Sequence, residues 1–366
     1  LIGKGKLAEV SVVPHGEGKT NLQVNVPENG KCYLKLTYHL KKEMPLLEED
    51  YILGFDEIEV SQKDAKCQLA EKWFEKTVTD SELQVSEDDT QIHIKGREFA
   101  YTIDRRTALF TEMKFAGREY LNHPMELNIW RAPTDNDMYI KSEWKKAHYD
   151  KAYTRAYTTE VVQGKHGVKI TSHASVVAET VQKILDVTIT WKIEAAGKID
   201  ADIAVTKDDE FPDLPRFGVR MFLDKKLSAA RYFGMGPQES YCDKHQAASH
   251  GLYHANVDDL HEDYIRPQEN GSHYDCEYVE LNNSRYGIVV SAENAFSFNA
   301  SYYTQEELEK KTHNYELTES DSVVFCVDYA LNGIGSNSCG PVVLDQYRFD
   351  DVLFRFQFTL IPYVKG

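Results

Sequence analysis

LDVTITWKIEAAGKIDADIAVTK, residues 185–207, is the stretch that decides the fold class. Apolar side chains alternate with polar ones from Val187 to Ile193, and again from Ile199 to Val205. A period of two is typical of a strand with one face in the core and the other in water. The Ala-Ala-Gly turn between the two runs predicts that they pair as an antiparallel hairpin.

The same alternation recurs at residues 91–94 and 353–360, and helical patterns are few. The candidate helices span residues 64–76, 141–151 and 304–311, and Thr304 precedes Glu307 at the spacing of a capping box. Strands separated by turn residues favour antiparallel sandwiches over strand–helix–strand units. We therefore expect an all-β protein.

The chain has 366 residues, which favours two or three domains. A polar, helix-prone stretch at 63–79 separates two β-rich regions, so we expect a linker there. The predicted domains are residues 1–62, which is short for a sandwich, and residues 80–366.

The composition excludes several classes of partner. A formal net charge of −17 repels nucleic acids and anionic membrane surfaces, and no apolar run approaches the ~20 residues that span a bilayer. The six cysteines form no C-x-x-C pair and match no zinc pattern. Free thiols favour a reducing compartment, so we expect a cytoplasmic location, with the periplasm as the alternative.

Two short motifs have plain structural interpretations. Asp135-Asn136-Asp137 resembles the start of a calcium loop, but Ile140 and Lys146 occupy the positions where that loop needs Gly and Glu. We expect a polar turn in which Asp135 or Asp137 pairs bidentately with Arg131. The glycines at 234 and 236, followed by proline, predict a sharp corner at a strand end rather than a dinucleotide site.

Generic motifs give no catalytic machinery. His245, His250 and His254 lie close together, but surface histidines are the better interpretation than a metal site. No G-x-S-x-G elbow is present, and 59 acidic residues do not single out a catalytic pair.

Longer stretches carry a resemblance. In this order along the chain they are WRAPTDND (130–137), LPRFG (214–218), GMGPQESY (234–241) with Asp243 after it, YIRPQENG (264–271), FSFN (296–299) leading to EEL (306–308), and GIGSNSCGP (333–341). Together they resemble the C-terminal, small-subunit-like region of the lac-type β-galactosidases of glycoside hydrolase family 2. GFDEI (54–58) and Gln62 resemble, more weakly, the end of the preceding small sandwich.

The resemblance implies an immunoglobulin-like sandwich, possibly incomplete at its N-terminus, over residues 1–62. A large antiparallel sandwich of the galactose mutarotase kind is implied over 80–366. In the family, both catalytic glutamates lie on an earlier TIM barrel, which commonly uses Mg and Na. The acid–base glutamate there follows an asparagine, and this sequence has no Asn-Glu dipeptide. We therefore expect no catalytic residue and no cofactor in this chain.

The resemblance also implies a loop at the mouth of the barrel, here called the rim loop, residues Asn337 to Pro341. Some members present a Trp that could stack on a sugar face, where this chain has Cys339. Asn337, Ser338 and Cys339 are the substrate-rim candidates, and a purely structural Gly-rich turn with a half-buried thiol is the alternative. Gly333, Gly335 and Gly340 are expected to allow unusual backbone angles.

Seven residues of these segments are expected to be structural rather than catalytic: Arg131, Asp135, Asn136, Asp137, Glu239, Arg266 and Glu269. Family members often carry a Gly just after the motif at 135–137, where this chain has Met138-Tyr139. Either the loop runs differently, or that position does not need a positive φ.

We expect a non-catalytic part of an enzyme that hydrolyses terminal β-D-galactosides. Its partners would be the barrel, on the same polypeptide or on a separate large subunit, and galactoside at the rim. Two alternatives remain: a free-standing carbohydrate-binding module, and a mutarotase-like enzyme with a His acid and a carboxylate base.

Overall fold

The computed structural model describes residues 1–8, 10–28, 30–61 and 83–365. The chain divides into two compact units, residues 1–68 and 69–366. The predicted linker at 63–79 and the predicted helix at 64–76 lie outside the described residues.

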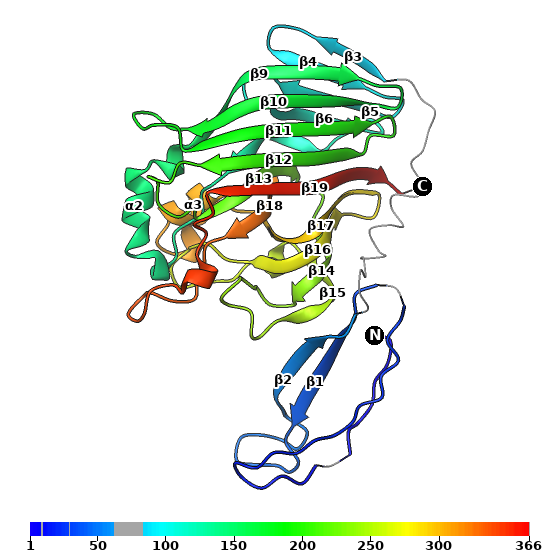
Figure 1. The fold of residues 1–366 in the computed structure, drawn as a ribbon, viewed down its shortest axis with the longest axis vertical. Coiled ribbons are helices and arrows are strands. Elements are labelled where there is room, and N and C mark those ends of the chain that lie inside the picture. Colours follow the sequence, from blue (N-terminus) through cyan, green and yellow to red (C-terminus); the bar gives the residue numbers. More distant parts are fainter. Residues whose placement is uncertain (9, 29, 62–82, 366) are drawn as a thin grey trace. The chain divides into compact units, whose positions relative to one another are not determined.

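The described part of the first unit contains one two-stranded antiparallel sheet (Figure 1). Strand β1 (Tyr33–His39) pairs with β2 (Ile52–Glu59), and Val60 N–H donates to Cys32 C=O at 2.9 Å beyond the strand ends. The immunoglobulin-like sandwich expected here stays a prediction.

The second unit contains a five-stranded sheet and a twelve-stranded sheet, in which all neighbouring strands are antiparallel. The small sheet has the order β3 (Gln84–Glu87), β4 (Gln91–Lys95), β5 (Phe99–Asp104), β6 (Leu109–Phe115) and β7 (Arg118–Glu119).

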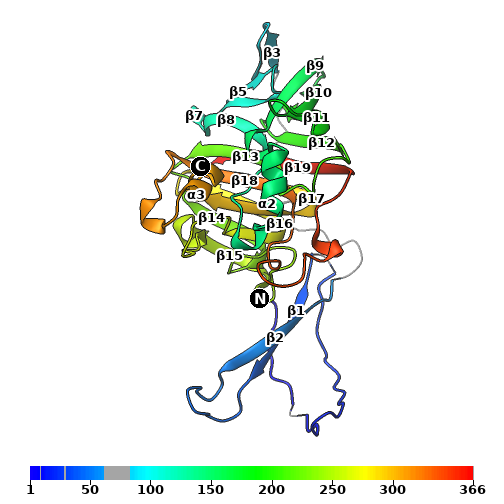
Figure 2. The ribbon, with the colours of Figure 1, turned by 90° about the vertical axis from the view of Figure 1, so that its left-hand side faces the viewer.

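The main path of the large sheet begins at β15 (Ser249–Asn256) and continues through β14 (Ala229–Gly236), β16 (Ser272–Asn282), β17 (Tyr286–Ser301), β19 (Leu353–Val364), β12 (Ile199–Lys207), β11 (Leu185–Glu194), β10 (Gly167–Val177) and β9 (Tyr153–Gln163). From β17 a branch leads through β18 (Ser322–Leu331) to β13 (Arg216–Asp224) and β8 (Leu121–Asn128). Figures 1 and 2 show the long strands β9 to β12 side by side with β19.

The hairpin expected from residues 185–207 is confirmed as β11 and β12. Ile193 lies opposite Ile199 and Val187 opposite Val205, so the apolar faces of both strands coincide. These side chains are buried, whereas Lys192 between them is exposed. Gly197 in the turn has φ +92°, a conformation that glycine adopts at little cost.

The two sheets of this unit pack face to face. Phe110 and Trp191 meet edge to face at 4.9 Å between ring centroids, and Trp191 Nε1–H donates to Ala108 C=O at 2.8 Å. Tyr101 O–H donates to Gly197 C=O at 2.7 Å. Each polar atom of these buried aromatic side chains therefore has a partner across the sandwich.

Helices are short, as the sequence indicates. α2 (Ile140–Lys146) and α3 (Gln305–Lys310) confirm two of the predicted helices, and Thr304 Oγ1 accepts the Glu307 N–H at 3.1 Å, as its capping position requires. Single 3-10 turns are η1 (Asp135–Asp137), η2 (Tyr149–Lys151), η3 (Asp258–Leu260), η4 (Asn314–Glu316) and η5 (Asp345–Tyr347). The all-β class is confirmed. Among the described helices, none is long and apolar enough to cross a membrane.

Candidate functional site

Three of the motifs contact a single connection, residues 332–352 between β18 and β19, through Arg131 and Asn136, through Pro215 and through Asp243. Arg131 is fully buried, and its Nε and Nη2 donate to Asp137 Oδ2 and Oδ1 at 3.2 and 2.6 Å. The same guanidinium donates to the carbonyls of Asn332 and Gly333. The predicted bidentate pair is therefore Arg131–Asp137, and it fixes the start of the connection.

The η1 turn adds two further contacts. Asn136 Nδ2 donates to Ile334 C=O at 2.5 Å, and Asp137 Oδ2 accepts the Thr134 N–H at 2.8 Å. Asp135 is not the partner of Arg131: its N–H donates to Gln268 Oε1 at 3.0 Å. Met138 has φ −52° and Tyr139 φ −91°, so this position does not need a positive φ.

Asp243 binds the next two residues of the connection. Its Oδ1 accepts the Ile334 N–H at 2.9 Å, and its Oδ2 accepts the Gly335 N–H at 2.8 Å. A Cβ placed on Gly333 would lie 2.6 Å from Asp243 Oδ2, which only glycine avoids. The expectation of unusual backbone angles at Gly333, Gly335 and Gly340 was wrong, because the positive φ of this region falls on Asn337 (φ +87°).

The rim loop itself lies on the surface. Ser338, Cys339, Gly340 and Pro341 are exposed, and Asn337 is half-buried. The strands that flank the connection, β18 and β19, belong to the core of the sandwich. The loop is thus an exposed tip on a rigid base, a common arrangement for binding residues.

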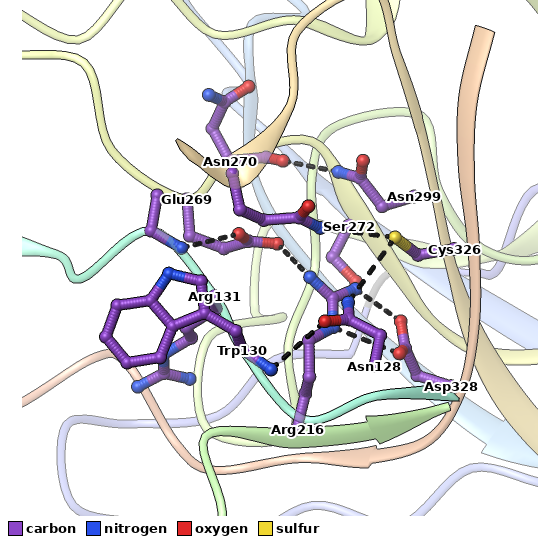
Figure 3. A network of polar contacts seen from close by, with 12 residues as sticks. Asn128, Trp130, Arg131, Arg216, Glu269, Asn270, Ser272, Asn299, Cys326 and Asp328 are labelled. Carbon is purple, nitrogen blue, oxygen red and sulfur yellow. Dashed lines mark hydrogen bonds and ion pairs between the residues drawn. The ribbon is translucent and has the colours of Figure 1, made fainter. Parts of the chain in front are cut away.

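On β13, Arg216 is buried between two carboxylates (Figure 3). Its Nε and Nη2 donate to Asp328, and its Nη1 donates to Glu269 Oε1 at 2.7 Å. Glu269 Oε2 also accepts the Ala132 N–H at 3.3 Å, which ties the motif after β8 to strand β13. Burial raises the pKa of Asp328 to about 6, against the opposing effect of the Arg216 charge.

Glu239, in the loop between β14 and β15, also binds several neighbouring groups. It accepts the Gly271 N–H at 2.9 Å and the Tyr241 O–H at 3.2 Å, and also bonds to Tyr264 and Lys244. Arg266, by contrast, is exposed, and its guanidinium makes no ion pair among the described residues. The structure thus brings all the motif residues together except the side chain of Arg266.

Sequence reasoning missed Asp328 and Asn332, and it gave no role to Arg216, which lies in the quoted segment LPRFG. The backbone carbonyl of Asn332 accepts a hydrogen bond from Arg131 Nη1. The Asn332 side chain accepts the Phe349 N–H through Oδ1 at 2.8 Å. Charged residues in otherwise apolar strands were the available signal for Arg216 and Asp328, since such groups are rarely buried without a partner. No group of three His, Cys, Asp or Glu side chains that could hold a metal occurs in the described part of the chain.

The acidic side chains of this network already have bonding partners. Asp137, Glu269 and Asp328 are buried, the side chain of Glu239 is 6% exposed, and each carboxylate is already bonded to cations or N–H donors. A glycosidase instead needs two carboxyl groups that face a sugar about 5 to 9 Å apart.

Comparison with known proteins identifies the family. A family model described as beta galactosidase small chain matches residues 95–360. The chain belongs to the β-galactosidase small-chain family. It is 41% identical over 363 residues to a β-galactosidase of Actinobacillus pleuropneumoniae, covering 99% of this chain and 35% of that protein. A Staphylococcus xylosus β-galactosidase is 32% identical over 326 residues, covering 89% of this chain and 32% of that protein.

This family member therefore spans about a third of the length of the curated relatives it matches. Among solved structures, galactose 1-epimerase from Lactobacillus acidophilus NCFM aligns with 79% of this chain and 100% of its own, at 8% identity and a TM-score of 0.40. A likeness at that score supports no conclusion about activity.

Proposed function

We propose that this chain is the non-catalytic C-terminal portion of a β-galactosidase that hydrolyses terminal β-D-galactosides. It scaffolds the enzyme and presents the rim loop to an active site built by a separate TIM-barrel region. The proposed partners are that barrel region, on the same polypeptide or on a large subunit, and the galactoside at the rim.

One observation carries the proposal. Two segments far apart in the sequence, around Arg131 and Asp243, both hold the base of one exposed loop, and Glu269 holds the Ala132 N–H next to Arg131. Buried charged networks are costly to build. The convergence of the Arg131 and Asp243 contacts on the base of the rim loop supports a role in which the position of that loop matters.

The state of the carboxylates supports the non-catalytic part of the proposal. The carboxylates of Asp137, Glu239, Glu269 and Asp328 already bind Arg131, Arg216, Lys244 or backbone amides. Catalysis by a glycosidase pair needs one group free to protonate and one free to attack. The motif carboxylates do not fit those roles.

The test is reconstitution of activity. The purified chain is assayed with a chromogenic galactoside alone, and then after coexpression with the preceding two-thirds of the Actinobacillus pleuropneumoniae β-galactosidase. We expect no turnover from either part alone and turnover from the pair. Hydrolysis by the chain alone, abolished by one Glu or Asp substitution within it, would refute the proposal.

The same preparation decides between the alternatives. Conversion of α- to β-galactose by the chain alone, followed by polarimetry, would favour a mutarotase-like enzyme. Binding of galactosides with no effect on hydrolysis by the coexpressed barrel would favour a free-standing carbohydrate-binding module.

A further inference from the structure

The large unit contains a cavity of about 310 Å³ beside the connection between β18 and β19. Its walls come from β16, β17 and β18 and from η5 with the residues that follow it. Sites for small ligands begin at about 300 Å³. The cavity is therefore of a size for one small molecule rather than for a peptide.

Besides the buried Tyr241, three tyrosines from three different elements line this cavity: Tyr274 on β16, Tyr329 on β18 and Tyr347 on η5. All three are half-buried, and their hydroxyl groups make no hydrogen bond within the described part of the chain. The hydroxyls of the core residues Tyr101 and Tyr149 do have partners, Gly197 C=O and Pro212 C=O, each at 2.7 Å. The cavity thus gathers unused donors beside aromatic faces.

Two further polar side chains add to this set. The Gln346 amide and the Asp351 carboxylate line the cavity, and neither has a hydrogen bond or ion pair among the described residues. Tyr274 stacks on His245 at 5.7 Å, and Tyr329 stacks on Phe354 at 4.9 Å between ring centroids. Ring contacts therefore hold two of the three tyrosines in place.

The charge around the cavity is acidic. Asp275 and Asp351 line it. The guanidinium of Arg348, which also lines it, already donates to Asp213, from Nε to Oδ2 at 2.9 Å and from Nη2 to Oδ1 at 3.1 Å. Cys242 also lines the cavity, and burial raises the pKa of its thiol to about 12, so it is not a nucleophile near neutral pH. An anionic ligand would be repelled, and the unbonded tyrosine hydroxyls and the Gln346 amide suit a neutral ligand rich in hydroxyl groups.

We propose that this cavity binds one neutral monosaccharide, separately from the rim loop. The aromatic rings offer faces for the apolar side of a pyranose, and the Tyr274, Tyr329 and Tyr347 hydroxyls, with Gln346 and Asp351, bind its hydroxyl groups. The choice of galactose as the sugar rests on the proposed function. The existence of the cavity and of its unbonded hydroxyl groups is independent of that function.

The test is calorimetric titration of the 366-residue chain with galactose. We expect saturable binding that weakens roughly three- to tenfold in each of Tyr274→Phe, Tyr329→Phe and Tyr347→Phe, because each change removes one hydrogen bond and keeps the ring. Tyr157→Phe, at an exposed site on β9, is the matched control and should bind as the wild type does. Galactose 6-phosphate should bind more weakly than galactose because of the acidic walls.

A second measurement locates the sugar. Galactose should slow hydrogen exchange at residues 346–349 in the wild type and much less in Tyr347→Phe. No saturable binding up to the solubility limit of galactose, or equal weakening by Tyr157→Phe, overturns the inference. Hydrolysis by the reconstituted enzyme without galactose binding by the chain would overturn the cavity site alone; binding without hydrolysis on reconstitution would overturn the proposed function alone.

Discussion

The Asp243 carboxylate accepts the backbone N–H of Gly335 at 2.8 Å, although the two residues are 92 positions apart. Its other oxygen accepts the neighbouring N–H of Ile334. Both oxygens of one side chain thus satisfy two successive amides at the base of the rim loop. The position of the exposed tip is set by this contact and by the Arg131 contacts on the other side.

Asp243→Asn should loosen the loop base. An amide has only one oxygen, so its NH₂ group would face one of the two backbone N–H groups and leave it unpaired, at a cost of about 1–3 kcal/mol. We expect faster hydrogen exchange at residues 334–335, with the core strands unchanged. Asp345→Asn, whose carboxylate is 97% exposed in the same connection, is the control. Equal exchange in the two variants would contradict the prediction.

Arg131→Met should lower the free energy of unfolding strongly. Arg131 and Asp137 are 0% and 4% exposed, so the change leaves a buried carboxylate without its cation, a loss of about 3–5 kcal/mol. Arg355 and Asp202 form a similar bidentate pair on the surface, where Arg355 is 62% exposed. Arg355→Met should cost at most about 1 kcal/mol because solvent screens that pair.

Urea unfolding of both arginine variants measures the difference, and Arg131→Met combined with Asp137→Leu should recover part of the loss. Similar losses in the two single variants would mean that Arg131–Asp137 does not behave as a buried pair.

His273 should make stability depend on pH. Burial lowers the pKa of this imidazole to about 4, and Nδ1 lies 3.2 Å from Met235 C=O. Between about pH 4 and the unfolded value near 6.5, the unfolded chain binds more protons. Stability is therefore full above pH 6.5 and falls as the pH drops toward 4, by about 3 kcal/mol in total.

His273→Phe keeps the stacking on Phe298 but removes the titrating group. The urea concentration at the midpoint of unfolding should fall less in this variant than in the wild type when the pH is lowered from 7 to 4.5. His254→Phe, at an exposed position, should leave the pH dependence as it is in the wild type. An unchanged pH slope in His273→Phe would contradict the assignment.

The strands could be predicted from the sequence because each carries its own pattern. Val187, Ile189 and Trp191 alternate within one strand, and the hairpin needs only local turn chemistry. The helix cap at Thr304 could be predicted for the same reason, since its partner Glu307 is three residues away.

The buried network around Arg131 and Arg216 could not be predicted from the pattern of neighbouring residues in the sequence. Arg216 and Asp328 are 112 positions apart and meet only because β13 pairs with β18. Resemblance singled out Arg131 and Asp137, but not the carbonyls of Asn332 and Gly333 that Arg131 also binds. The cavity at Tyr274 and Tyr347 is likewise a product of the topology, because its tyrosines come from distant elements.

The rim loop gives the last prediction, in the reconstituted enzyme. Cys339 is exposed, while burial raises the pKa values of Cys242 and Cys326 to about 12 and about 11, so Cys339 should be alkylated faster than either in the isolated chain. Galactoside should slow this reaction after reconstitution if the loop meets substrate. Cys339→Trp should then lower KM more than it changes kcat, because stacking on the sugar face stabilises substrate and transition state alike. Cys339→Ala, which removes the thiol without adding a ring, is the control and should leave KM near the wild-type value. A neutral Cys339→Trp, together with alkylation that galactoside does not slow, would place the loop away from the sugar and leave this chain with a scaffolding role only.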